Sequence, residues 1–83
     1  MAPKVTAPAW QKRSWPEAEQ ELELSRKTIQ SYAFEALRLL HPHHRPAVRE
    51  GMMRAGGVEF PLSGRRVRMA RRGHRYKVWT AAN

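Results

Sequence analysis

The sequence predicts a small α+β domain in which two or three helices precede a basic β-hairpin. Apolar residues recur with a helical period up to residue 55 and with a period of two beyond Gly57. All seven acidic residues lie within positions 16–60, whereas positions 61–83 hold seven bases and no acid. A chain of 83 residues has room for one domain. We therefore expect the helices to form its body and the hairpin its charged surface.

Three helices are expected from their end signals. Ser14 and Glu17 have the spacing of a capping box, in which each side chain accepts from the other residue's backbone N–H. Ser25 has the position of a second N-cap, and the apolar face that follows it is the clearest periodic signal in the chain. Arg45-Pro46 opens a third helix, which Gly56-Gly57 ends. The expected helices span residues 15–23, 26–40 and 46–55. Their expected inward positions are Ile29, Tyr32, Ala33, Ala36, Leu37, Leu40, Val48 and Met52.

The C-terminal third is expected to be the hairpin and the N-terminus an arm. Residues 58–79 alternate apolar and polar side chains around turn signals at Ser63-Gly64 and Gly73, which is typical of antiparallel strands. Residues 1–13 hold two prolines and scattered apolar side chains, so we expect a flexible basic arm there. The domain itself is then residues 14–83.

The overall charge points to a polyanionic partner. The net charge is +9 and the pI is near 11.4, which favours nucleic acid, an anionic membrane or an acidic protein. No apolar run approaches the ~20 residues that cross a bilayer, and no signal-peptide core is visible, so we expect a cytoplasmic protein that does not act at a membrane.

No motif predicts catalysis, a cofactor or a metal. The sequence has no phosphate-binding loop, nucleophile elbow or carboxylate pair in a plausible cleft, so we do not expect an enzyme. His41, His43 and His44 span a proline break, and there are no cysteines to complete a zinc site, so a solvated loop is the expected role of these histidines.

The segment 17–40 carries a helix-turn-helix pattern. It contains Leu22-Glu23-Leu24-Ser25-Arg26-Lys27-Thr28-Ile29. This stretch resembles the junction Leu-x-Ile/Leu-Ser-x-x-Thr-Val/Ile between the support and recognition helices of LuxR-type regulators and sigma-factor region 4. The resemblance implies that the recognition helix presents Arg26, Lys27, Gln30 and Ser31 to the major groove, with Arg38 on the same exposed side. The chain departs from the pattern at Glu19, where a small residue is usual, and at Glu23, where glycine is usual. The alternative is an ordinary helical hairpin in which Ser25 is only a cap.

Helices followed by a basic hairpin also resemble winged-helix proteins in layout, such as phage and plasmid excisionases and MerR-type regulators. The likeness is one of layout alone, and the helix expected at 46–55 departs from it. It implies that the hairpin contacts phosphates or the minor groove through Arg65, Arg66, Arg68, Arg71, Arg72, Arg75 and Lys77. These bases could instead be a solvated face, or pair within the fold with the glutamates of the first helix. Tyr76 and Trp79 could stack on bases or pack in the core.

Together these features predict a DNA-binding protein, either a transcriptional regulator or a recombination or architectural factor, of phage or plasmid type. Helix 26–40 would read the DNA and the hairpin would hold phosphates. A domain of this size makes a short footprint, so a homodimer is a further expectation. Two alternatives are a small phage-type inhibitor that binds a host protein through its basic face, and an RNA-binding protein that uses the hairpin and its aromatic residues.

Overall fold

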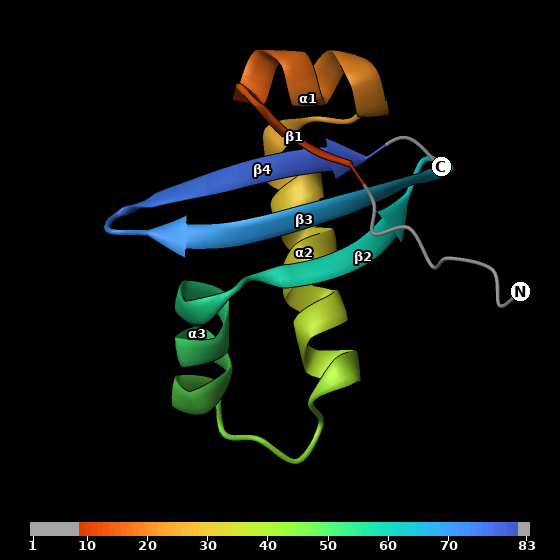
Figure 1. The fold of residues 1–83 in the computed structure, drawn as a ribbon. Helices are drawn as coiled ribbons and strands as arrows, with labels where there is room; N and C mark the ends of the chain where they lie inside the picture. Colours follow the sequence, from red (N-terminus) through yellow and green to blue (C-terminus); the bar gives the residue numbers. More distant parts are fainter. Residues whose placement is uncertain (1–8, 82–83) are drawn as a thin grey trace, which may run out of the picture.

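The computed structural model describes residues 9–81 and confirms the α+β class. Within these residues three helices cover one face of a four-stranded antiparallel sheet (Figure 1). The expected helix bounds and the observed bounds agree to within one residue. The elements in chain order are β1 (Trp10–Arg13), α1 (Trp15–Leu22), α2 (Arg26–Leu40), α3 (Pro46–Ala55), β2 (Val58–Leu62), β3 (Arg65–Arg72) and β4 (Arg75–Ala81).

The sheet has the strand order β1-β4-β3-β2. The expected hairpin is thus a three-stranded meander to which the N-terminal segment adds an edge strand. Residues 10–13, which we expected in a flexible arm, pair with β4 from Trp10↔Ala81 to Arg13↔Val78. The physical reason is that this edge of β4 would otherwise leave unpaired backbone N–H and C=O groups. The rest of the expected arm, residues 1–8, lies outside the described residues.

Local capping chemistry explains where α1 and α2 begin. Ser14 and Glu17 form the capping box in full, with the Ser14 backbone N–H donating to the Glu17 carboxylate at 3.0 Å. This hydrogen bond is the largest cause that lowers the pKa of Glu17, and the hydrogen bond with the Ser14 side chain is the second. Ser25 caps α2 through its hydroxyl, which accepts from the Thr28 N–H at 3.3 Å. Between the two helices Glu23 takes a left-handed conformation, φ 56° and ψ 38°, so the glutamate occupies the turn position that usually favours glycine.

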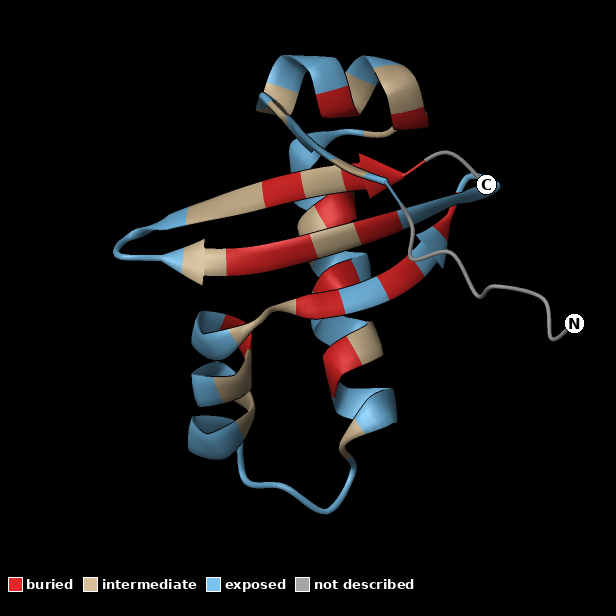
Figure 2. Ribbon diagram, viewed as in Figure 1, coloured by how far each residue is buried: buried red, intermediate tan, exposed pale blue. Residues whose placement is uncertain are grey.

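The core lies between the helices and the inner face of the sheet. From α2, Ile29, Ala33 and Leu37 pack against strand residues that include Phe60 and Val67. Figure 2 shows buried positions both on α2 and on the strands of the sheet. Three residues expected to point inward are exposed instead: Tyr32 (49%), Leu40 (58%) and Val48 (47%). In Figure 1 the C-terminal end of α2 and the start of α3 extend past the β2 edge of the sheet, so Leu40 and Val48 have no strand to pack on. Met53 is the buried residue of α3.

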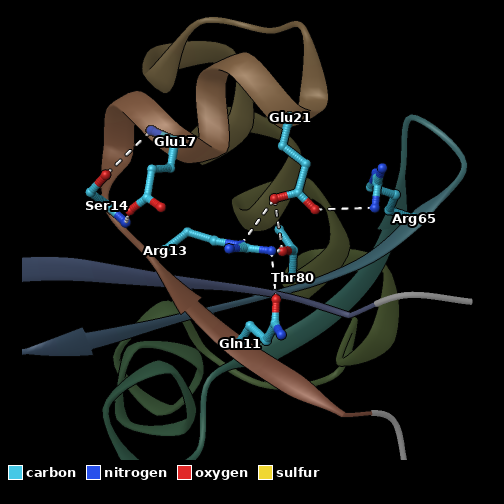
Figure 3. Close-up of polar contacts among 7 residues, drawn as sticks. All are labelled: Gln11, Arg13, Ser14, Glu17, Glu21, Arg65 and Thr80. Atoms are coloured by element: carbon cyan, nitrogen blue, oxygen red, sulfur yellow. Dashed lines mark hydrogen bonds and ion pairs between the residues drawn. The ribbon is translucent and has the colours of Figure 1, made fainter.

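One carboxylate joins four elements of the fold (Figure 3). Glu21 of α1 forms ion pairs with Arg13 of β1 at 3.1 Å and with Arg65 of β3 at 3.2 Å. It also accepts a hydrogen bond at 3.1 Å from the hydroxyl of Thr80 in β4, which is the one buried polar side chain in residues 9–81. The Glu21 side chain is only 17% exposed, so this junction is largely shielded from water.

Replacement of Glu21 should therefore destabilise the fold. We expect Glu21→Ala to lower the free energy of unfolding by about 2 kcal/mol, because the buried Thr80 hydroxyl and two arginines lose their shared acceptor. Glu59→Ala is the matched control, since Glu59 forms an exposed pair with Arg66 and such pairs contribute about 0–1 kcal/mol. Urea unfolding followed by circular dichroism measures both. Equal losses for the two variants would show that the Glu21 junction holds nothing together.

The link between α3 and β2 depends on a glycine. Gly57 has φ +82°, and a Cβ placed there would lie 2.8 Å from the Ala70 Cβ and still closer to the Met69 carbonyl oxygen. Gly51 lies within α3 with no atom within 4 Å of an added Cβ.

Alanine at these two glycines should change stability in opposite directions. Gly57→Ala should destabilise the protein by more than the about 1–2 kcal/mol of left-handed strain, because the backbone of β3 must also move. Gly51→Ala should stabilise it by roughly 0.5–1 kcal/mol through helix propensity. Thermal unfolding of both variants checks the signs, and a stable Gly57→Ala protein would contradict the close approach of this link to β3.

Candidate nucleic-acid interface

The sheet has one face that no helix of the described chain covers. Cross-strand partners share a face, so the register separates the two sides. The row Val58, Met69, Val78 faces the helices, whereas the neighbouring row Glu59, Arg68, Trp79, Lys12 faces outward. We call this outward side the open face. Its charged and aromatic residues are Trp10, Lys12, Glu59, Arg66, Arg68, Arg72, Arg75, Lys77 and Trp79.

The open face collects most of the hairpin bases that the sequence identified. Arg66, Arg68, Arg72, Arg75 and Lys77 all lie on it. The other two, Arg65 and Arg71, point toward the helices. Arg65 pairs with Glu21 of α1 and Arg71 with Glu50 of α3. Strand alternation is the cause, because residues of odd number in β3 share the side of Val67 and Met69.

The expected base-reading residues of α2 lie on the other side of the sheet. The guanidinium of Arg26 sits 4.8 Å from the centroid of the Trp15 ring. Ser31 donates its hydroxyl to the Lys27 carbonyl at 2.9 Å, Gln30 is half-buried, and Arg38 forms an exposed pair with Glu35. A straight duplex that lies on the open face therefore does not reach Lys27, Ser31 or Arg38.

A basic notch opens where β1 ends. Strand β1 pairs with β4 only as far as Val78, so the first residues of β4 have no strand beside them on this edge. The Trp15 indole N–H donates to the carbonyl of Tyr76 there, at 3.0 Å. The resulting pocket has a volume of about 540 Å³ and is lined by Lys12, Arg13, Ser14, Trp15, Arg26, Arg75, Tyr76 and Lys77. Five of these eight residues are cations and none is an acid. The notch thus brings Arg26 of α2 to the same place as the bases of β4.

Lys12 and Trp15 are among the residues of this site that the sequence did not identify. Lys12 lies on the open face and lines the notch, but residues 1–13 carry no pattern that predicts a strand. Trp15 was not among the residues expected to contact a ligand. A signal was present in both cases, because Lys12 and Trp15 flank the capping serine and so must lie near the start of the first helix.

Charge pairing within the fold leaves the open face and the notch largely uncompensated. Within residues 9–81, Glu21 is the only glutamate on or just after α1 that pairs with arginine, so this helix neutralises Arg65 alone among the hairpin bases. On the open face Glu59 pairs with Arg66 at 3.5 Å. Arg68 donates to the Gly56 carbonyl, at 2.8 Å from Nε, and lies 5.5 Å from the Trp79 ring centroid. Within residues 9–81, the cations of this surface that form no ion pair are Lys12, Arg26, Arg68, Arg72, Arg75 and Lys77.

The part of the chain that the structure describes contains no cluster of three or more histidine, cysteine or acidic residues that could hold a metal ion. The rings of His41 and His44 contact each other edge to face, with centroids 5.5 Å apart. Within residues 9–81, none of the helices has the length and apolar character needed to span a membrane.

Comparisons with protein-family models, with curated proteins and with solved structures found no match for this chain.

Proposed function

We propose that this protein binds DNA through its open face and basic notch. The observation that carries the proposal is the set of six cations on one continuous surface that have no acidic partner within residues 9–81. Phosphates would neutralise them with release of counterions. Arginine forks also match the geometry of phosphate oxygens. The proposal is one of binding and not of catalysis.

The geometry favours the sheet over helix α2 as the main contact. The open face is a broad two-dimensional surface, and the notch continues it around the β4 edge to Arg26. Helix α2 offers only separate side chains, of which the Ser31 hydroxyl is bonded to the Lys27 carbonyl and Arg38 is paired with Glu35. The left-handed Glu23 supports a helix-turn-helix junction, but a helix in the major groove would require a ligand on the opposite side of the molecule from most of the bases. Regulation and recombination both remain proposals for the role of such binding.

A second candidate function is inhibition of a host protein. Leu39 and Leu40 at the end of α2 are 72% and 58% exposed, and Val48 near the start of α3 is 47% exposed. Exposed apolar surface of this kind is the observation that favours a protein partner. A pull-down from nuclease-treated lysate separates the two functions, because a DNA-binding protein loses its partners under nuclease and an inhibitor retains one.

The charge-deletion variant Arg75→Ala/Lys77→Ala tests the DNA proposal. We expect it to weaken binding about tenfold or more and to lower the slope of log K against log salt by up to about two units, since two phosphate contacts are lost. Labelled single-stranded and duplex DNA are titrated at several salt concentrations to measure this. Neither residue packs in the core, so thermal unfolding should be unchanged.

Lys27→Ala/Arg45→Ala is the matched control, because it removes the same charge from exposed positions outside the open face and the notch. We expect its affinity to stay within about twofold of the parent protein. If the control loses the affinity and the Arg75/Lys77 variant keeps it, the contact lies on the helical side that carries Lys27 and Arg45. If neither form of DNA binds even at low salt, the DNA proposal is wrong.

A further inference from the structure

The open face contains two tryptophans among its cations. Trp79 of β4 lies between its cross-strand partners Arg68 of β3 and Lys12 of β1. In the next row of the same face, Trp10 of β1 pairs with Ala81 of β4. Trp79 pairs with Lys12, and Trp10 lies two positions before Lys12 on the same face of β1. The two indoles are therefore diagonal neighbours on adjacent strands. Both side chains are half-buried, which leaves part of each indole in contact with solvent.

The tryptophans are not needed to fill the core. The core cluster consists of residues on the inner face and on the helices, and neither Trp10 nor Trp79 belongs to it or packs against it. A large aromatic side chain on an outward strand position exposes apolar surface to water, which costs free energy unless a partner covers it. Trp15 differs, because it packs against the core cluster and its indole N–H is bonded to Tyr76.

The surroundings of Trp79 hold its ring in place. Arg68 donates two hydrogen bonds to the Gly56 carbonyl, through Nε at 2.8 Å and through Nη2 at 2.5 Å, and its guanidinium lies 5.5 Å from the ring centroid. A guanidinium fixed in this way restrains the indole before any ligand arrives. The residues opposite Lys77 and Arg66 on β3 and β4 are Ala70 and Ala81, which are small and lie buried beneath their neighbours, at 0% and 2% exposure.

We propose that the open face binds single-stranded DNA, with bases stacked on Trp79 and Trp10 and phosphates held by the surrounding cations. The inference rests on the proposed DNA binding and specifies the form of DNA. Charge complementarity favours this occupant, because Glu59 is the one acid on the open face and it is already paired with Arg66. Aromatic stacking requires unpaired bases, since a duplex presents only its backbone and groove edges to a sheet.

Fluorescence and affinity measurements on the full chain test the inference. The probes are an oligothymidylate of about 16 nucleotides, within the site sizes known for sheet-based single-strand binders, and a duplex and an abasic oligonucleotide of the same length. We expect the oligothymidylate to bind more tightly than the duplex and to quench tryptophan emission. The abasic strand keeps the phosphates but has no bases, so it should bind more weakly than the oligothymidylate.

Tryptophan variants locate the contact. Trp79→Leu should weaken oligothymidylate binding about five- to 150-fold, the range of one stacked base, and leave duplex affinity within about twofold. Trp79→Phe keeps an aromatic ring and should lose less, which guards against a Trp79→Leu protein that fails to fold. Trp10→Leu should also weaken single-strand binding. Tyr32→Leu is the control, because Tyr32 is an exposed aromatic residue of α2 outside the open face and the notch, and it should retain the preference for single strands.

The outcomes separate this inference from the DNA proposal. Duplex binding equal to or tighter than single-strand binding, or folded Trp79 variants with unchanged single-strand affinity, would overturn the inference while the DNA proposal stood. RNA of the same sequence bound about tenfold more tightly than DNA would overturn the assignment of the ligand as DNA. Absence of binding to every nucleic acid would overturn both.

Discussion

The Glu21 carboxylate is the interaction on which the arrangement of the sheet depends. Strand β1 has only four residues, and a strand of this length gains little from its own backbone pairing. Arg13 at its end is fixed by Glu21 and by Thr80, and Gln11 in turn accepts from Arg13 at 2.6 Å. These contacts hold β1 against β4 at the point where the chain turns into α1. Without them Lys12 would leave the open face and the notch would lose one wall.

The two sides of the arginine-rich strand β3 differ in how their charges are compensated. Strand β3 has bases on both faces, and apolar side chains occupy only the middle of its inner face. At the two ends of that inner face, Arg65 meets Glu21 and Arg71 meets Glu50, so each flanking helix supplies one acid. On the outward side, Arg68 and Arg72 donate to backbone carbonyls, and Arg68 also lies over an aromatic ring. Arg66 pairs with one exposed glutamate. The charge that remains for a ligand is therefore concentrated on one side.

Local signals made the helices predictable, and long-range contacts made the sheet edge unpredictable. Ser14, Glu17 and Ser25 act within three residues of their own positions, so their role can be read without the fold. Strand β1 has no such signal, because its partners in β4 lie 65 to 71 positions away along the chain, from Arg13↔Val78 to Trp10↔Ala81. The exposure of Tyr32, Leu40 and Val48 could not be predicted either, because helical periodicity gives a side of the helix but not the length of sheet beneath it.

The candidate site shows the same division. Composition identified the basic C-terminal third, since a run of bases without acids is visible at once. It could not assign Arg65 and Arg71 to the inner side, because the side depends on the register with β2 and β4. The notch was beyond prediction, since Arg26, Lys12 and Arg75 come from three parts of the chain that only the β1–β4 pairing brings together.

Local electrostatics gives a physical reason to prefer the open face over helix α2 as the surface that meets phosphates. At physiological ionic strength the screening length is about 8 Å, so a ligand responds to the charges near its contact and not to the net charge of +9. Glu23 lies in the turn just before α2, three positions before Arg26 and four before Lys27. Its carboxylate would repel a phosphate that approached these two bases. The open face has no acid beside Arg72, Arg75 or Lys77, and its one glutamate is neutralised by Arg66. If the protein binds DNA as proposed, the attraction per phosphate is thus greater on the sheet, on the side where Trp10 and Trp79 lie.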